Sequence, residues 1–264
     1  MDQHLNFIPE ELRALFPSDL LKAKRLVEDY IQRTHNTNLH DFFSLLKDFV
    51  ITVKKKRDSH TEHLVKYETH KIRKGRDTPK TFYPFVFNDM MGLENGSDSG
   101  VPPDDIKLAM KGHVKEGHTF NHLEPLTDRD PGYNPAPSLQ DKVHVLVCVI
   151  SANSPEITLS LLQKMKKVKD MARDLGIPQM AVMTSIDLAC SETEKDLKNV
   201  YRSRHLKQKM SDFSSAVGIP MNCIFPVKNY SEEIDLDDDV DTLILSALRH
   251  MLDFGDDFID KLKP

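Results

Sequence analysis

The chain has 264 residues, of which 39% are hydrophobic and 29% charged, so it is long enough to bury a core in one large domain or two small ones. Its formal net charge of -5, with acidic and basic residues mixed along the chain, favours neither nucleic acid nor anionic lipid as a partner. No membrane-spanning run or secretory signal pattern is found and the three cysteines are read as reduced thiols, so we expect a cytoplasmic protein.

Residues 1–60 are expected to form a helical N-terminal segment. The short run FVITV, residues 49–53, could also form a strand, but its spacing with the apolar residues before it favours a helix. The basic run Lys54 to Arg57 is read as a solvated helix end, because no aromatic residues are interleaved with it as in a nucleic-acid site. The apolar residues with helical spacing are Phe42, Phe43, Leu46, Phe49, Val50 and Val53.

A β-hairpin is predicted next in the chain. VKYETHKI and TFYPFVFND are rich in β-branched and aromatic residues, and the turn-forming string KGRDTPK lies between them. A Gly/Ser-rich loop, a short helix near residues 104–111 and a Pro-rich loop follow.

From residue 143 the chain alternates between strand and helix patterns. Strand VHVLVCVIS precedes a helix over 156–175, strand QMAVMTSID precedes a helix over about 192–217, and strand NCIFPVK precedes a final helix. Gly176 and Gly218 are the expected stops of the first two helices. This order predicts an α/β fold with a three-layer architecture, in which helices cover both faces of a mostly parallel sheet.

Polar residues follow three of these strands, and ligands bind at the carboxyl ends of strands in open α/β sheets. In FVFNDMMG, Asp89 and Gly92 have the Asp-x-x-Gly spacing of nucleotide-hydrolysing switch proteins. There the Asp holds Mg²⁺ through water, and the Gly presents its N–H to the γ-phosphate. For each of these two residues alone, an ordinary turn after a strand is the simpler reading.

The other two strand ends could hold a guanine base. Asp187 in MTSID stands where a carboxylate accepts from the base N1 and N2 donors, although Thr184 and Ser185 replace the usual Asn and Lys. A loop acid near the next helix is an equally good reading of Asp187. The candidate nucleotide-binding residues are Asp89, Gly92, Thr184, Asp187, Lys228 and Asn229, with Mg²⁺ on Asp89 only if a nucleotide binds.

Two further clusters are read as structural. The acidic residues Asp235 to Asp239 lack the Gly and Glu of a calcium loop, and acidic residues before a helix favour its positive end. His113, His118 and His122 lie in a loop-like segment without a matching Cys or carboxylate cluster, so packing or surface roles are expected.

Six strings carry a resemblance to a known family: THKIRKGRDTPKTFYPFVFNDMMGLE, DDIKLAMKGHVKEGHTFN, DPGYNPAPSLQDKVHVLVCVI, YRSRHLKQKM, GIPMNCIFPVKNYSEEIDLDDDVDTLILSALRHML and DFGDDFID. Through them, residues from about Tyr67 to Lys261 resemble the interferon-induced protein 44 family. The resemblance implies a GTPase fold of the dynamin-superfamily type, a P-loop nucleoside-triphosphatase architecture, cytoplasmic location and a role in innate antiviral immunity. It places residues 61–264 in a GTPase-like domain and leaves residues 1–60 outside the match.

The phosphate-binding loop G-x-x-x-x-G-K-S that opens such a domain was not found. The nearest string is GRDTPKT, Gly75 to Thr81, which is one residue short, has Pro79 in place of the second Gly and leads into a strand. The main-chain amides and Lys of that loop provide most of the electrostatic hold on a triphosphate. We therefore expect a non-enzymatic, GTPase-like module that binds protein partners, with the central first strand missing or replaced; the alternative is weak GTP binding with Mg²⁺.

Overall fold

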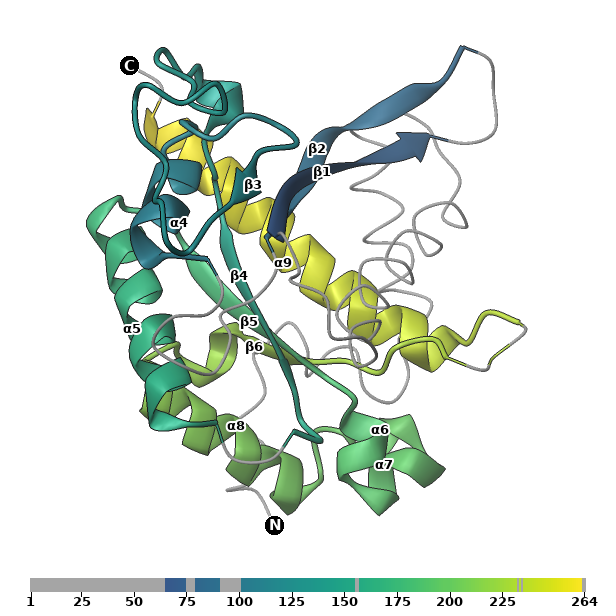
Figure 1. Ribbon diagram of the computed structural model, residues 1–264. Coiled ribbons are helices and arrows are strands. Elements are labelled where there is room, and N and C mark those ends of the chain that lie inside the picture. Colours follow the sequence, from purple (N-terminus) through teal and green to yellow (C-terminus); the bar gives the residue numbers. More distant parts are fainter. Residues whose placement is uncertain are drawn as a thin grey trace. The chain divides into compact units, whose positions relative to one another are not determined.

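The computed structural model describes residues 65–74, 79–90, 101–154, 157–231, 233 and 235–262. They fall into two compact units. The hairpin unit comprises the described residues up to 144 together with 157–177, and the parallel-sheet unit comprises 145–154 and the described residues from 178 onward. Within these residues the strands form two three-stranded sheets, one in each unit (Figure 1). The parallel sheet β4-β5-β6 with its helices agrees with the predicted α/β class, whereas the predicted hairpin belongs to the other, antiparallel sheet.

The sheet of the hairpin unit is antiparallel. Strand β1 (Val65–Lys74) lies between β2 (Thr81–Met90) and β3 (Thr119–Phe120). Lys74 pairs with Thr81, which confirms the hairpin predicted around KGRDTPK and shows that this string leads into a strand. Side chains alternate along β2, since Tyr83 is buried while its neighbour Phe82 is exposed.

Three helical elements complete the described part of the hairpin unit: α4 (Pro103–Met110), the 3-10 helix η2 (Leu139–Asp141) and α5 (Leu159–Asp174). α4 packs against α5, and the buried Asp105 of α4 accepts a hydrogen bond from Leu126 N at 3.0 Å, which ties the Pro-rich loop to the helix. The Thr158 hydroxyl caps α5 by accepting from Leu161 N, and Gly176 follows the helix with a φ of 71°, as predicted for its stop.

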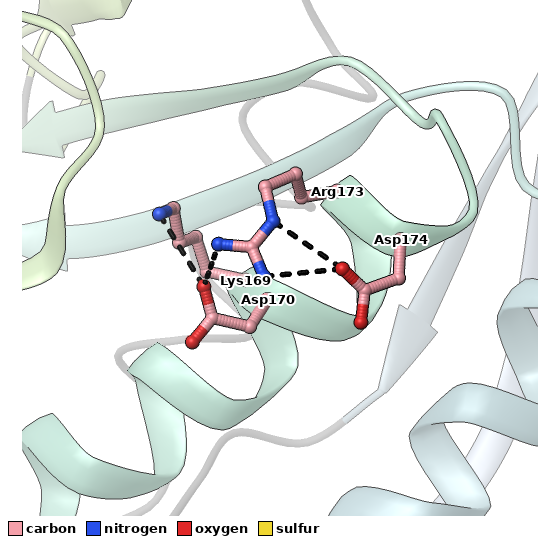
Figure 2. Close-up of polar contacts among 4 residues, drawn as sticks. All are labelled: Lys169, Asp170, Arg173 and Asp174. Carbon is pink, nitrogen blue, oxygen red and sulfur yellow. Dashed lines mark hydrogen bonds and ion pairs between the residues drawn. The ribbon is translucent and has the colours of Figure 1, made fainter.

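An ion-pair cluster lies near the C-terminal end of α5 (Figure 2). The Arg173 guanidinium donates to Asp170 Oδ1 at 2.8 Å and to Asp174 Oδ1 at 3.1 Å, and Lys169 Nζ lies 3.5 Å from Asp170 Oδ1. Arg173, Asp170 and Asp174 are about half exposed or more, so these pairs contribute little to stability.

The parallel-sheet unit confirms the predicted alternation of strands and helices. β4 (Leu146–Ser151), β5 (Gln179–Thr184) and β6 (Ile224–Pro226) are parallel in the order β4-β5-β6. The central strand β5 is buried from Met180 to Thr184, as its continuous apolar sequence requires. Figure 1 shows α8 (Arg204–Val217) and α9 (Asp238–Leu262) flanking this sheet.

The helix predicted over about 192–217 is interrupted, which corrects the sequence reading. Two polar side chains provide caps inside the predicted span: Asp196 Oδ1 accepts from Lys198 N at 3.0 Å, and Ser203 Oγ accepts from Leu206 N at 3.3 Å. The last of these helices, α8, ends at Gly218 as predicted, and this glycine has a φ of 87°. The elements between β5 and β6 are α6 (Ile186–Ala189), α7 (Ser191–Lys195), the 3-10 helix η3 (Leu197–Asn199), α8 and the 3-10 helix η4 (Met221–Cys223).

The core of the parallel-sheet unit forms where α9 packs on β6. Phe225 of β6 is 2% exposed, and its ring centroid lies 4.7 Å from that of His250 on α9. The first half of α9 is buried, whereas its second half is partly exposed. Among the described helices, none combines the length and apolar character that crossing a bilayer requires.

Candidate functional site

Four of the six predicted site residues, Thr184, Asp187, Lys228 and Asn229, lie beyond or at the carboxyl ends of β5 and β6. Thr184 is the last residue of β5, is 4% exposed, and its hydroxyl donates to Ile150 O of β4 at 3.2 Å. This hydroxyl therefore joins neighbouring strands of the sheet rather than pointing freely toward a ligand.

Ser185 forms a sharp turn between β5 and α6. Its φ of 57° and ψ of 36° are left-handed, and among the described residues it is the one non-glycine with a positive φ. Such strain is concentrated at functional sites. The turn places Asp187 in the first turn of α6, half-buried. The sequence reading noted Ser185 only as a replacement for Lys, because no composition signal marks this conformation.

Lys228 is held by a partner that sequence reasoning missed. Its Nζ lies 2.6 Å from Glu233 Oε1, and both side chains are about three-quarters buried, at 23% and 24% exposure. Burial lowers the pKa of Lys228, but the hydrogen bond and charge of Glu233, together with the charges of Asp187 and Asp237, outweigh burial and raise it. The ammonium is therefore already neutralised by carboxylates of the same chain. No short motif joins Lys228 to Glu233, so the pair has no sequence signature.

The carboxylate of Glu233 should make stability depend on pH. Burial alone would raise its pKa, but hydrogen bonds from Lys228 and from the Ser231 N–H lower the pKa to about 2. Because the folded-state pKa lies below the ordinary glutamate value of 4.5, the stabilisation is present above pH 4.5 and is lost as the pH falls toward 2. We expect Glu233→Gln to lower the free energy of unfolding by about 2 kcal/mol at pH 7, and by about half as much at pH 3, in urea titrations.

Glu194→Gln is the control for this prediction, since Glu194 is an exposed carboxylate of α7 in the same unit. It should change stability by less than about 0.5 kcal/mol at either pH. A Glu233→Gln deficit that stays constant from pH 7 to pH 3 would show that the ion pair with Lys228 does not form.

Asn229 has a buried amide oxygen without a partner. The residue is 8% exposed, and its Oδ1 has no hydrogen-bond partner among the residues that the structure describes. An unpaired buried acceptor is costly, which marks the position as one where a donor from a ligand would be stabilising.

The loop after Asn229 is fixed by its neighbours. The Tyr230 hydroxyl lies 2.5 Å from Asp241 Oδ1 and accepts from Asp237 N at 2.8 Å. Asp237 Oδ1 accepts from the N–H groups of Asp239 and Val240, which confirms that the acidic run caps a helix. The loop that carries Lys228 and Asn229 is therefore anchored to α9.

Asp89 belongs to the hairpin unit. The sequence predicts it at the end of its strand, but the strand runs one residue further. Asp89 lies inside β2, one residue before the end, because antiparallel pairing continues through Asp89 opposite Glu68 and Met90 opposite Tyr67. Burial raises the pKa of Asp89; the nearby His70 lowers it, and Glu68 raises it further. Gly92 lies outside the described residues.

A second glycine pair has the spacing of a phosphate-binding loop, which the sequence reading overlooked. Of the ten glycines, only Gly112 and Gly117 stand five residues apart, in GHVKEGHT, with His118 where the loop Lys would be. Both have left-handed φ values, 85° and 78°. The i, i+5 glycine spacing was the signal that could have identified this segment.

Five main-chain amides of this glycine segment, including those of both glycines, already donate to carbonyls within the hairpin unit. The segment leads into strand β3 instead of a helix. A phosphate-binding loop needs free N–H groups at a helix N-terminus, so neither the amides nor the direction of this segment fits a triphosphate. The donors are Gly112 N to Ala109 O, His113 N to Leu108 O, Lys115 N to Gly132 O, Gly117 N to Tyr67 O and His118 N to Lys115 O, over 2.9–3.1 Å.

Two of the three loop histidines have packing roles. The His113 ring stacks on Tyr133 with a centroid distance of 5.0 Å, and its Nδ1 is 2.9 Å from Asn134 O. His118 packs edge-on against Phe120, also at 5.0 Å. In the described part of the chain, no group of three or more His, Cys, Asp and Glu side chains is arranged to hold a metal ion.

Comparison with curated proteins finds close relatives for most of the chain. It is 31% identical over 94% of its length to "Interferon-induced protein 44" of Mus musculus, covering 62% of that protein. It is 33% identical over 75% of its length to "Interferon-induced protein 44-like" of Homo sapiens, and 32% over 75% to "Interferon-induced protein 44" of Homo sapiens. It covers 43% and 44% of these two human proteins.

The chain therefore spans only about two fifths to three fifths of the length of these relatives. The alignment with the mouse protein covers 94% of the chain, and residues 1–60 make up more of the chain than the uncovered remainder. That alignment therefore includes part of residues 1–60. No family model and no solved structure matches the chain. At 31–33% identity over three quarters or more of its length, the chain belongs to the interferon-induced protein 44 family.

Proposed function

We propose that the chain acts in the interferon response as a degenerate GTPase-like module that binds protein partners in the cytoplasm and does not hydrolyse GTP. The names of its relatives support the link to interferon. Support for a GTPase-like ancestry comes from the parallel β4-β5-β6 sheet with polar residues at its carboxyl end.

One observation supports the proposal that the chain does not hydrolyse GTP. The single glycine pair with phosphate-loop spacing, Gly112 and Gly117, has its amides bonded to carbonyls of the same unit and precedes a strand. Without free amides and a Lys, a triphosphate lacks the main source of its binding energy. The Lys228 ammonium cannot readily substitute, because Glu233 neutralises it at 2.6 Å.

Hydrolysis of GTP by the purified chain tests this proposal. We expect phosphate release in the presence of Mg²⁺ to equal that of Asp89→Ala, because Asp89 is paired within β2 and lacks a phosphate loop to act with. A rate above that of Asp89→Ala, proportional to protein concentration, would overturn the proposal.

A second candidate function is weak binding of a guanine nucleotide. The unpaired Asn229 Oδ1, the strained Ser185 and the half-buried Asp187 favour it, since they gather polar groups at one end of the sheet. In that function Asp187 would accept hydrogen bonds from the base. Thermal unfolding with millimolar GTP and Mg²⁺ separates the two functions, because a ligand raises the midpoint only if it binds the folded state. We expect no shift, whereas a shift that Asp187→Ala abolishes would establish the second candidate.

A further inference from the structure

The outer face of the β1–β2 hairpin combines exposed apolar side chains with basic residues. Phe82 and Val86 are each 43% exposed, and Pro84 between them is exposed as well. These three residues of β2 lie on one face because side chains alternate along a strand. Tyr83, Phe85 and Phe87 occupy the opposite face, where Tyr83 stacks on Phe85 and Phe85 packs edge-on against Phe87.

Basic residues stand beside this apolar row in the strand register. Exposed Lys71 of β1 is opposite Val86, and exposed Lys80 directly precedes β2. The described residues that share the face through this pairing include no acidic residue, since Glu68 and Asp89 pair with each other on the other face. This face of the β1–β2 hairpin is therefore cationic and apolar, on a chain whose net charge is -5.

Two features of β2 exclude other roles for this surface. β2 is at the edge of its sheet, but Pro84 in its middle has no N–H to offer, so the edge is a poor template for an added strand. Single-stranded nucleic acid stacks its bases on aromatic rings, and two of the three exposed residues, Pro84 and Val86, have none.

We infer that this face, defined by Lys71, Lys80, Phe82, Pro84 and Val86, docks peripherally on an anionic lipid surface. Lysine side chains are attracted to anionic headgroups, while neighbouring apolar side chains enter the interfacial region. Insertion stops at that depth, because an open sheet edge cannot enter the hydrocarbon core with its main-chain groups unpaired. The inference is independent of nucleotide binding and adds a location to the proposed function.

Vesicle co-sedimentation tests this inference. The full chain is mixed with vesicles of phosphatidylcholine alone or with about 30% phosphatidylserine, at low and at physiological salt. We expect binding to the anionic vesicles only, weakened by salt because the attraction is screened. Lys71→Glu with Lys80→Glu should reduce binding by about tenfold or more, since each reversal changes the surface charge by two.

Two further variants keep the test specific. Phe82→Ala with Val86→Ala should also reduce binding by about tenfold at unchanged charge, and both side chains are exposed enough for the fold to tolerate their loss. Lys111→Glu with Lys166→Glu makes the same charge change at exposed positions of α4's end and α5, and should keep most of the binding. Equal sedimentation with both vesicle types, equal loss in the control, or retention by poly(uridylic acid) without vesicle binding would overturn the inference.

Discussion

Replacing Phe225 with Ala is expected to lower the free energy of unfolding by about 3–5 kcal/mol, the range for removing a buried aromatic side chain. Phe225 is 2% exposed in β6 and packs against His250 of α9, so the substitution leaves a cavity between the sheet and its long helix. Neighbouring core residues come from both β5 and α9, which limits how far the cavity can collapse. Urea unfolding followed by far-UV circular dichroism measures the loss.

Leu236→Ala is the matched control for Phe225→Ala. Leu236 is 53% exposed in the same unit, so truncating it should cost less than about 1 kcal/mol. Similar losses at Phe225 and Leu236 would contradict the packing of α9 on β6 described above. Because one residue separates Lys228 and Asn229 from the end of β6, that packing also positions the candidate site.

The second large effect is expected at Gly112, where Ala should destabilise the protein by about 3–4 kcal/mol. Its φ of 85° is left-handed, which costs an L-residue about 1–2 kcal/mol. A Cβ there would also lie 2.8 Å from Asp141 O and 2.9 Å from Pro137 Cβ, and a main-chain oxygen cannot move aside cheaply. Thermal and urea unfolding of Gly112→Ala measure the sum of both terms.

Gly117→Ala separates these two contributions. Gly117 has nearly the same φ, 78°, but a Cβ added there meets no atom within 4 Å. It should therefore cost only the backbone term, about 1–2 kcal/mol. If both alanine variants lose the same stability, the loop containing Gly112 does not pack against Asp141 as described. The two variants thus test the packing of the Gly112–Gly117 segment, whose internally bonded amides leave a phosphate group without donors.

Helices and strands with a clear pattern of apolar residues and turn residues could be predicted from the sequence. The hairpin was found because β-branched and aromatic residues flank a turn string, and Lys74 indeed pairs with Thr81. The parallel strands β4, β5 and β6 followed from short apolar runs, and the helix ends at Gly176 and Gly218 from the left-handed stop that glycine allows.

Features decided by local hydrogen bonds or by distant partners could not be read in this way. The predicted helix over about 192–217 is broken because Asp196 and Ser203 cap new helical turns, and apolar spacing does not register such competition. Asp89 stays within β2 because its position depends on pairing with Glu68 rather than on its own turn propensity. For the site, Asp187 and Asn229 were found from strand ends, but the Lys228–Glu233 pair depends on loop geometry.

The partners of the Gly112–Gly117 amides show the same limit at longer range. Lys115 N donates to Gly132 O and Gly117 N to Tyr67 O, residues far away in the sequence. The sequence motif contains only the glycine spacing, which fits a phosphate-binding loop. The tertiary structure determines that these amides donate to carbonyls of the same unit. The spacing alone would have favoured the opposite functional conclusion.

Calorimetric titration of the purified chain with GTP and Mg²⁺ tests the central proposal most directly. A sheet whose strand-end lysine is neutralised by Glu233, in a chain whose glycine loop is bonded internally, should give only heats of dilution up to millimolar nucleotide. A saturable isotherm with one site per chain, lost in Asp187→Ala, would contradict it.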